Sequence, residues 1–168
     1  MLAAMSLDGY LASPDGEVDW LDPYADARGR FGAFIKTIGS AIMGRATYDW
    51  AVKHGHADFG GMPTYVVTHR PFPAPSAQLV PYSGDLRALV EQLRRRHRRD
   101  VWLMGGGILI NGFREADLID IWSIAVIPTL LGAGLLMFPP MAFREHRLQL
   151  VQTRKYPSGV VELRYERR

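Results

Sequence analysis

Residues 101–115 read VWLMGGGILINGFRE, and this stretch decides the fold. Its first part, residues 101–104, is apolar with a valine and a tryptophan, which predicts a short buried strand. Its last part, residues 108–115, predicts a helix, and the three glycines between the two parts predict a tight turn. A strand that turns directly into a helix is the repeating unit of α/β folds.

The same alternation of strands and helices continues on both sides of this stretch. The clearest helix begins at Leu86 after Ser83 or Asp85 as a cap, and its apolar stripe continues through Leu89, Val90 and Leu93. Further helices are expected over residues 25–38 and 47–52, strands over 2–5, 41–43, 64–68, 78–80 and 118–127, a loop over 6–23, and a hairpin of 147–155 with 160–166. We therefore predict one α/β domain over residues 1–168, in three layers, with a mixed, mostly parallel sheet and a C-terminal antiparallel hairpin.

Composition excludes several classes of protein. The chain of 168 residues has 48% hydrophobic and 22% charged residues, which is close to the globular average and argues against a disordered chain or a coiled coil. Cysteine is absent, so a disulfide scaffold, a zinc finger and a thiol nucleophile are excluded. The formal net charge of +3 tolerates an anionic ligand without requiring nucleic acid.

One long uncharged stretch raises the question of a membrane span. Residues 121–143 contain no charged side chain, but prolines and glycines interrupt them from Pro128 onward. Residues 121–127 are rich in β-branched and aromatic side chains, and we predict that they form a strand buried on both faces. The N-terminus lacks a basic start, so no signal peptide is expected, and the predicted location is cytoplasmic.

Three turns on the predicted sheet are suited to bind an anion. Residues 105–107, 44–47 and 68–70 each follow a predicted strand and carry glycines, hydroxyls or arginines. In open α/β sheets the carboxyl ends of the strands form the ligand-binding edge, so three such turns predict a dinucleotide. Taken one at a time, the glycines also fit a turn without a ligand, and the arginines fit solvent-exposed side chains.

Four stretches in order resemble the dihydrofolate reductase superfamily, in the branch that includes the reductase domain of the riboflavin-biosynthesis deaminase/reductase. They are SLDGYLA (6–12) with DWL (19–21), MGRATY (43–48), MGGG (104–107), and DLID (117–120) followed by IPTLLGAG (127–134). Each motif is weak alone, but together they cover nearly the whole chain in the order of that family.

The resemblance implies a mixed sheet of about eight strands and an NADPH-dependent oxidoreductase. The nicotinamide would give a hydride to a small heterocyclic (pterin- or pyrimidine-like) or carbonyl/imine substrate. The residues that would bind the cofactor are Ala4 and Leu11 beside the nicotinamide, Gly44, Arg45, Thr47, Thr68, His69 and Arg70 around the phosphates, and Gly105, Gly106, Gly107, Ile108 and Leu109 along the pyrophosphate and the nicotinamide ribose. Arg45 and Arg70 independently favour the phosphorylated cofactor, because an arginine accommodates the 2′-phosphate.

The substrate half of the site departs from the resembled pattern. Tyr10 stands where the riboflavin reductases usually have a lysine, and Met104 stands where they usually have an acid. The candidates that remain are Tyr10 and Asp26 as catalytic residues, and Trp20 and Tyr48 as substrate contacts, although both tyrosines also fit packing roles. Asp8 is a further proton-source candidate, but its Asp-Gly sequence fits a turn in which the carboxylate caps backbone.

Three other features yield weaker hypotheses. The basic run of residues 94–99 fits a solvated helix end better than a nucleic-acid site, because no aromatic residue interrupts it to stack on bases. His54 and His56 lack convincing further ligands, so no metal is expected. Members of the resembled branch often pair, and the apolar residues 130–138 could form a two-fold interface, so we predict a homodimer. The alternatives to an enzyme are a catalytically silent nucleotide-binding or sensing module and a nucleic-acid binder.

Overall fold

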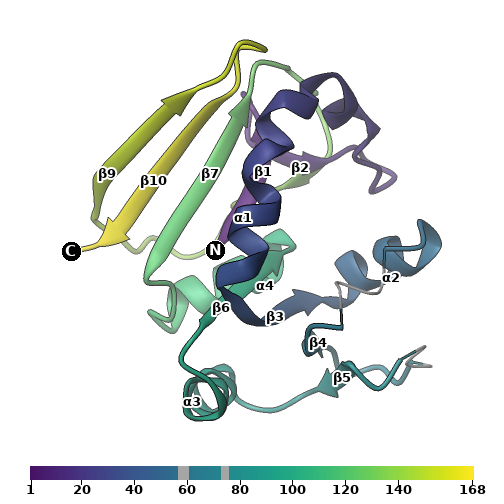
Figure 1. The fold of residues 1–168 in the computed structure, drawn as a ribbon. Coiled ribbons are helices and arrows are strands. Elements are labelled where there is room, and N and C mark those ends of the chain that lie inside the picture. The colour runs from purple at the N-terminus through teal and green to yellow at the C-terminus, as the bar shows by residue number, and fades with distance from the viewer. Residues whose placement is uncertain (57–60, 73–75) are drawn as a thin grey trace.

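A computed structural model describes residues 1–56, 61–72 and 76–168 of the chain (Figure 1). The strands are β1 (Leu2–Ser6), β2 (Tyr10–Ala12), β3 (Ile38–Gly44), β4 (Thr64–Val67), β5 (Leu79–Tyr82), β6 (Asp100–Gly105), β7 (Ile121–Ile127), β8 (Leu135–Leu136), β9 (Leu148–Lys155) and β10 (Val161–Arg167). The helices are α1 (Phe31–Thr37), α2 (Arg45–Lys53), α3 (Leu86–Arg96) and α4 (Gly107–Glu115), and a 3₁₀ stretch, η1 (Asp19–Arg30), precedes α1.

Two four-stranded sheets carry most of the strands. One has the order β5-β4-β3-β6 and is parallel throughout. The other has the order β1-β7-β10-β9, with β1 parallel to β7 and β10 antiparallel to both of its neighbours. Strand β6 is at the edge of the first sheet and β1 is at the edge of the second. The two strands are in contact, and the Trp102 indole N–H donates to the Leu2 carbonyl at 3.1 Å. The short strands β2 and β8 form a separate antiparallel pair.

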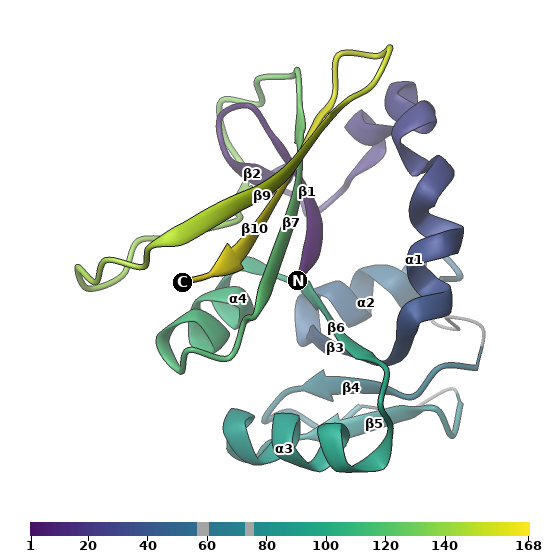
Figure 2. The ribbon, with the colours of Figure 1, turned by 60° about the vertical axis from the view of Figure 1, so that its left-hand side comes forward.

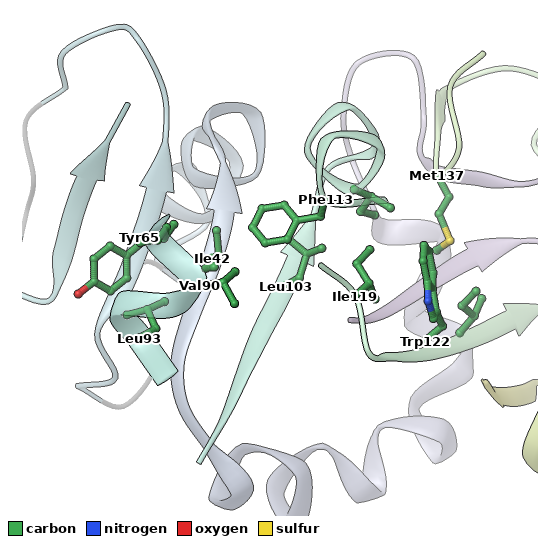
Figure 3. Close-up of a cluster of buried hydrophobic side chains, with 12 residues drawn as sticks. Ile42, Tyr65, Val90, Leu93, Leu103, Phe113, Ile119, Trp122 and Met137 are labelled. Carbon is green, nitrogen blue, oxygen red and sulfur yellow. The ribbon is translucent and has the colours of Figure 1, made fainter. Parts of the chain in front are cut away.

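Helices cover both faces of the parallel sheet, which confirms the α/β class and the layered arrangement (Figures 1 and 2). On one face, α3 and α4 contribute to the largest cluster of buried apolar side chains, together with strand residues such as Ile42 and Trp122 (Figure 3). On the other face, Tyr48 of α2 packs with Met43 and Val66. Successive residues of β3 thus point to opposite faces, as the two-residue period of a strand requires.

The predicted cap and the predicted buried strand are both present. The Asp85 carboxylate accepts a hydrogen bond from the Ala88 N–H at 2.9 Å at the start of α3. Strand β7 lies between β1 and β10, with Trp122, Ser123 and Ile124 buried. In the described ranges, no helix has the length and apolar character needed to cross a membrane.

Several sequence-based boundaries differ from those of the structure. Residues 31–37 of the helix predicted over 25–38 form α1, whereas residues 25–30 belong to the 3₁₀ stretch η1, which begins at Asp19 and contains Pro23. The predicted loop over residues 6–23 contains β2, which pairs with the two-residue β8. The strand predicted from residue 118 begins at Ile121.

Candidate active site

The three predicted anion-binding turns follow the ends of β3, β4 and β6. Because β3 pairs in parallel with both β4 and β6, these ends lie at one edge of the sheet. Met43 of β3 is the partner of Val66 in β4 and of Gly105 in β6, and Gly44 is the partner of Val67. The chain leaves these strands at Gly44, Thr68 and Gly106, so residues 44–47, 68–70 and 105–107 follow neighbouring strand ends. In open α/β sheets, ligands generally bind at the edge formed by the carboxyl ends of the strands.

The N-termini of α2 and α4 meet at this edge. An ideal Cβ on Gly44 would lie 3.6 Å from the Gly105 carbonyl oxygen, and one on Gly106 would lie 3.9 Å from Thr47 Oγ1. Among the described residues, no side chain caps either helix at its first turn. The first-turn N–H groups of both helices, with the Thr47 hydroxyl beside them, are therefore available to an anion.

Gly107 connects this edge to the β2–β8 pair. An ideal Cβ on Gly107 would lie 2.2 Å from the Leu136 carbonyl oxygen and 2.8 Å from Pro139 Cδ, so only glycine fits there. The Met137 N–H in turn donates to the Gly9 carbonyl at 2.9 Å. Strand β2, which carries Tyr10 and Leu11, is thus held next to the glycine turn, where the cofactor's nicotinamide half is expected.

Arg45 is oriented by several partners at the edge. Its Nε donates to Asp49 Oδ1 at 2.7 Å, and its Nη1 donates to the carbonyls of Arg70 and Pro71 at 3.4 and 3.3 Å. Thr68 organises the same loop, since its hydroxyl accepts from the Arg70 N–H at 3.1 Å. The Arg70 and His69 side chains are exposed, so a ligand can reach all three of the residues 68–70 and Arg45 from solvent.

Asp8 joins the loop after β1 to the loop after β7. Its carboxylate accepts hydrogen bonds from the Ser6 hydroxyl at 2.6 Å, the Leu131 N–H at 3.1 Å and the Gly132 N–H at 2.7 Å. These donors, the Ser6 hydroxyl first, hold the pKa of Asp8 below its ordinary value. The carboxylate caps backbone, as the turn interpretation predicts, but its backbone partners lie far along the chain.

We expect Asp8→Asn to lower the Tm at neutral pH, because the amide is a weaker acceptor for three donors. A carboxyl whose pKa is lowered by folding stabilises the protein above its unfolded pKa, and this stabilisation is lost as the pH falls through the folded pKa. The Tm difference between wild type and variant should therefore shrink once the pH drops below the ordinary value of 3.8. Thermal denaturation from pH 7 to acid measures it, and a difference independent of pH would contradict the assignment.

The four predicted catalytic and substrate residues do not gather at one point. Tyr10 lies on β2 with its hydroxyl 3.4 Å from the Gly132 carbonyl oxygen, and the Asp26 carboxylate is exposed and accepts from the Ser158 N–H at 3.0 Å. Tyr48 is buried in the core beside Phe72, which favours its packing role, and burial raises its pKa. Trp20 is half-buried in η1 and has a buried indole N–H with no partner among the described residues.

The contacts of His54 and of the basic run 94–99 favour neither a metal site nor a nucleic-acid site. His54 contacts Glu17 through Nε2 at 3.0 Å and the Trp50 carbonyl through Nδ1 at 2.9 Å. Across the described ranges, no group of three or more histidine, aspartate or glutamate side chains is arranged to hold a metal ion. The basic run occupies the last turn of α3 and the residues after it, and Arg94 pairs with Asp120 at 2.6 Å.

A cavity of about 1200 Å³ lies between α1 and strands β1, β6, β7 and β10. Its walls include Phe31 and Phe34 of α1, and its floor includes Ala4 and Ala125. The cavity extends between β1 and β6 toward α3. It is large enough for a small heterocycle beside a nicotinamide, and Ala4 is one of the two residues expected to flank that ring.

Sequence reasoning missed the polar group on this cavity's floor. Ser123 of β7, Glu162 of β10 and Tyr156, which follows β9, line the cavity and are joined by hydrogen bonds. The available signal was the alternation in VELRYER, residues 161–167, which places Glu162, Arg164 and Glu166 on one face of the strand. Recognising that this face is an inner one requires the tertiary structure.

Comparisons with known proteins agree with this architecture. The model of the RibD C-terminal domain family matches residues 1–162. The uncharacterized protein YwjB of Bacillus subtilis (strain 168) is 31% identical over 166 residues, which are 98% of this chain and 94% of that protein. The uncharacterized protein YyaP of the same organism is 27% identical over 182 residues, at 96% and 90% coverage.

Solved structures show the same fold. A putative riboflavin biosynthesis protein from Shewanella sp. PV-4 superposes with a TM-score of 0.87 at 24% identity, covering 99% of this chain and 97% of that one. RibD of Acinetobacter baumannii (form 1) superposes with a TM-score of 0.76 at 20% identity, and the match covers 99% of this chain but 56% of RibD.

Proposed function

The chain belongs to the RibD C-terminal domain family, and on that premise we propose that it is an NADPH-dependent reductase of a small heterocyclic, carbonyl or imine substrate. The observation that carries the proposal is the meeting of two helix N-termini, without side-chain caps among the described residues, at the strand edge that also bears Arg45. Such an edge fits the diphosphate and the 2′-phosphate of the cofactor.

The chemical groups at this strand edge match those that NADPH would need. Gly106 has no side chain, and an ideal Cβ there would have Thr47 Oγ1 at 3.9 Å as its nearest neighbour, so the backbone can approach a pyrophosphate closely. Arg45 and Arg70 supply two guanidinium groups at the neighbouring turns, and Thr47 supplies a hydroxyl. Ala4 and Leu11 would flank the nicotinamide, while Ile108 and Leu109 would border its ribose.

When bound, NADPH supplies the hydride, and the substrate takes up one proton as NADP⁺ forms. The chain's part is to hold the acceptor carbon over Ala4 and to exclude water from it. The apolar walls at Phe31 and Phe34 serve the second purpose. Tyr10 and Asp26 remain proposed proton sources, and Trp20 and Tyr48 remain proposed substrate contacts.

A cofactor titration tests the proposal. We expect saturable NADPH binding, followed by fluorescence and thermal shift, with NADH binding at least tenfold weaker. Oxidation of NADPH, followed at 340 nm with a panel of carbonyl and imine acceptors, is the expected activity. Absence of NADPH binding would overturn the proposal.

A catalytically silent nucleotide-binding module is the second candidate. It is favoured by the departures at Tyr10 and Met104, where the resembled reductases have charged substrate-binding groups, and by the partial burial of Met104 against core clusters. NADPH binding without oxidation across the acceptor panel would support this module over the enzyme.

The predicted homodimer is also a proposal. Met137 is fully buried and Phe138 packs on the core, so within residues 130–138 the large exposed apolar side chains are Leu130 and Leu135. A two-fold contact through these leucines would cover them. Sedimentation of wild type and Leu130→Glu tests it: we expect the variant to shift toward monomer, and a monomeric wild type would refute the dimer.

A further inference from the structure

The cavity floor carries a carboxylate held in place by two hydroxyl groups. Ser123 Oγ donates to Glu162 Oε1 at 3.1 Å, and the Tyr156 hydroxyl donates to Glu162 Oε2 at 2.8 Å. Burial, and then acceptance of this hydrogen bond by Glu162, raise the pKa of Tyr156, so its hydroxyl remains a donor at neutral pH. A carboxylate has about four acceptor positions, which leaves two for a ligand.

Among the described residues, this carboxylate makes no ion pair. Glu162 is partly buried, and in the described part of the chain no lysine, arginine or histidine lies within 4.0 Å of its oxygens. Arg154 is the partner of Glu162 across the β9–β10 ladder. A partly buried carboxylate is stabilised by a cationic or N–H-bearing partner, and the cavity leaves room for one.

Strand register relates Glu162 to the expected nicotinamide position. Ala4 of β1 is the partner of Ala125 in β7, and Ala125 is the partner of Glu162 in β10. All three residues line the cavity and so lie in one row across its floor. With adjacent strands about 4.8 Å apart, the Cα atoms of Ala4 and Glu162 are about 10 Å apart.

The row suits a flat molecule. The side chains of Ala4 and Ala125 are single methyl groups, which leave the space above the cavity floor free. Phe31 and Phe34 form part of the opposite wall. A ring laid over Ala125 would place one edge beside the residue expected to flank the nicotinamide and the other edge at the Glu162 carboxylate. Paired N–H groups on one carbon, as in an amidinium, match the two oxygens of a carboxylate.

We infer that Glu162, oriented by Ser123 and Tyr156, is the substrate-anchoring residue, and that it selects flat substrates with an amidine-like N–C–N donor edge. The inference deepens the proposed function and rests on it for the identification of the ligand as a substrate. This role is separate from that of Asp26, which is proposed as a proton source and lies on η1.

Paired probes test the anchor without requiring turnover. Benzamidine presents the N–C–N donor edge, and benzamide has the same shape without the charge. We expect ligand-observed NMR titrations to give wild-type protein a benzamidine Kd at least tenfold below that of benzamide. Glu162→Gln should raise the benzamidine Kd about tenfold or more, because a charge-assisted hydrogen bond is lost, and should change the benzamide Kd less than threefold.

Glu166→Gln is the matched control. Glu166 lies on the same face of β10 and is exposed, with Arg164 at 3.6 Å, so the same chemical change should leave both probes unaffected. Equal effects of the two substitutions, equal binding of the two probes, or no saturable benzamidine binding by wild type would overturn the anchor. Titrations run without NADPH separate this result from the proposed function, which fails only if NADPH itself does not bind.

Discussion

Gly107→Ala is expected to lower the Tm of the protein by roughly 10 °C. The new Cβ would lie 2.2 Å from the Leu136 carbonyl oxygen and 2.8 Å from Pro139 Cδ, and neither is the end of a flexible side chain. Relieving that overlap must move α4 away from the segment after β8. Overpacking of this kind costs about 3 kcal/mol, and for a chain of this length each kcal/mol corresponds to about 2–4 °C.

Two other glycines provide controls for this prediction. Gly32 lies in α1 with nothing within 4 Å of an added Cβ, so Gly32→Ala should leave the Tm unchanged or raise it slightly. Gly106→Ala meets only Thr47 Oγ1 at 3.9 Å and should fold normally, although its methyl group would occupy the proposed pyrophosphate position. Thermal denaturation by circular dichroism measures all three variants. A Gly107→Ala protein as stable as wild type would contradict the prediction, because it would show that the chain can move away from the Leu136 carbonyl at little cost in free energy.

The contrast between these glycines shows what the sequence can reveal. Local pattern is enough to find the glycine turn and the helix after it, because strand and helix spacings change within residues 101–115. It cannot reveal why Gly107 must be a glycine, because the atom that excludes a side chain belongs to Leu136, in a two-residue strand. Such a short strand has no periodicity of its own and depends on pairing with β2.

The candidate site divides in the same way. The meeting of the three turns at the proposed cofactor edge was predictable, because parallel strands bring their carboxyl ends together whatever the rest of the chain does. The substrate side was not, since Glu162 becomes relevant only when β10 pairs beside β7 and places it in a row with Ala4. Asp26, which the resemblance suggests as a catalytic residue, also has a partner that the sequence does not reveal, since its carboxylate accepts from the Ser158 N–H of the C-terminal hairpin.

Arg45→Ala is expected to raise the Kd for NADPH by about 10- to 100-fold, while the Kd for NADH changes less than threefold. The expected loss corresponds to a hydrogen bond between charged groups, about 1.5–3 kcal/mol, and only the 2′-phosphate of NADPH can make it. Arg45 is suited to this role because its side chain is already oriented toward the 70–71 turn by the carbonyls of Arg70 and Pro71. Fluorescence titration with the two cofactors measures the ratio directly.

Asp49→Asn isolates the role of the guanidinium from that of helix α2. In the structure the Asp49 carboxylate holds Arg45 Nε at 2.7 Å, and it would compete with an incoming phosphate for the same group. Removing that negative charge should tighten NADPH binding a few fold and leave NADH binding unchanged, which is the opposite direction from Arg45→Ala. If Arg45→Ala weakened both cofactors equally, Arg45 would serve the shared diphosphate or the fold of α2, and selection of the 2′-phosphate would pass to Arg70.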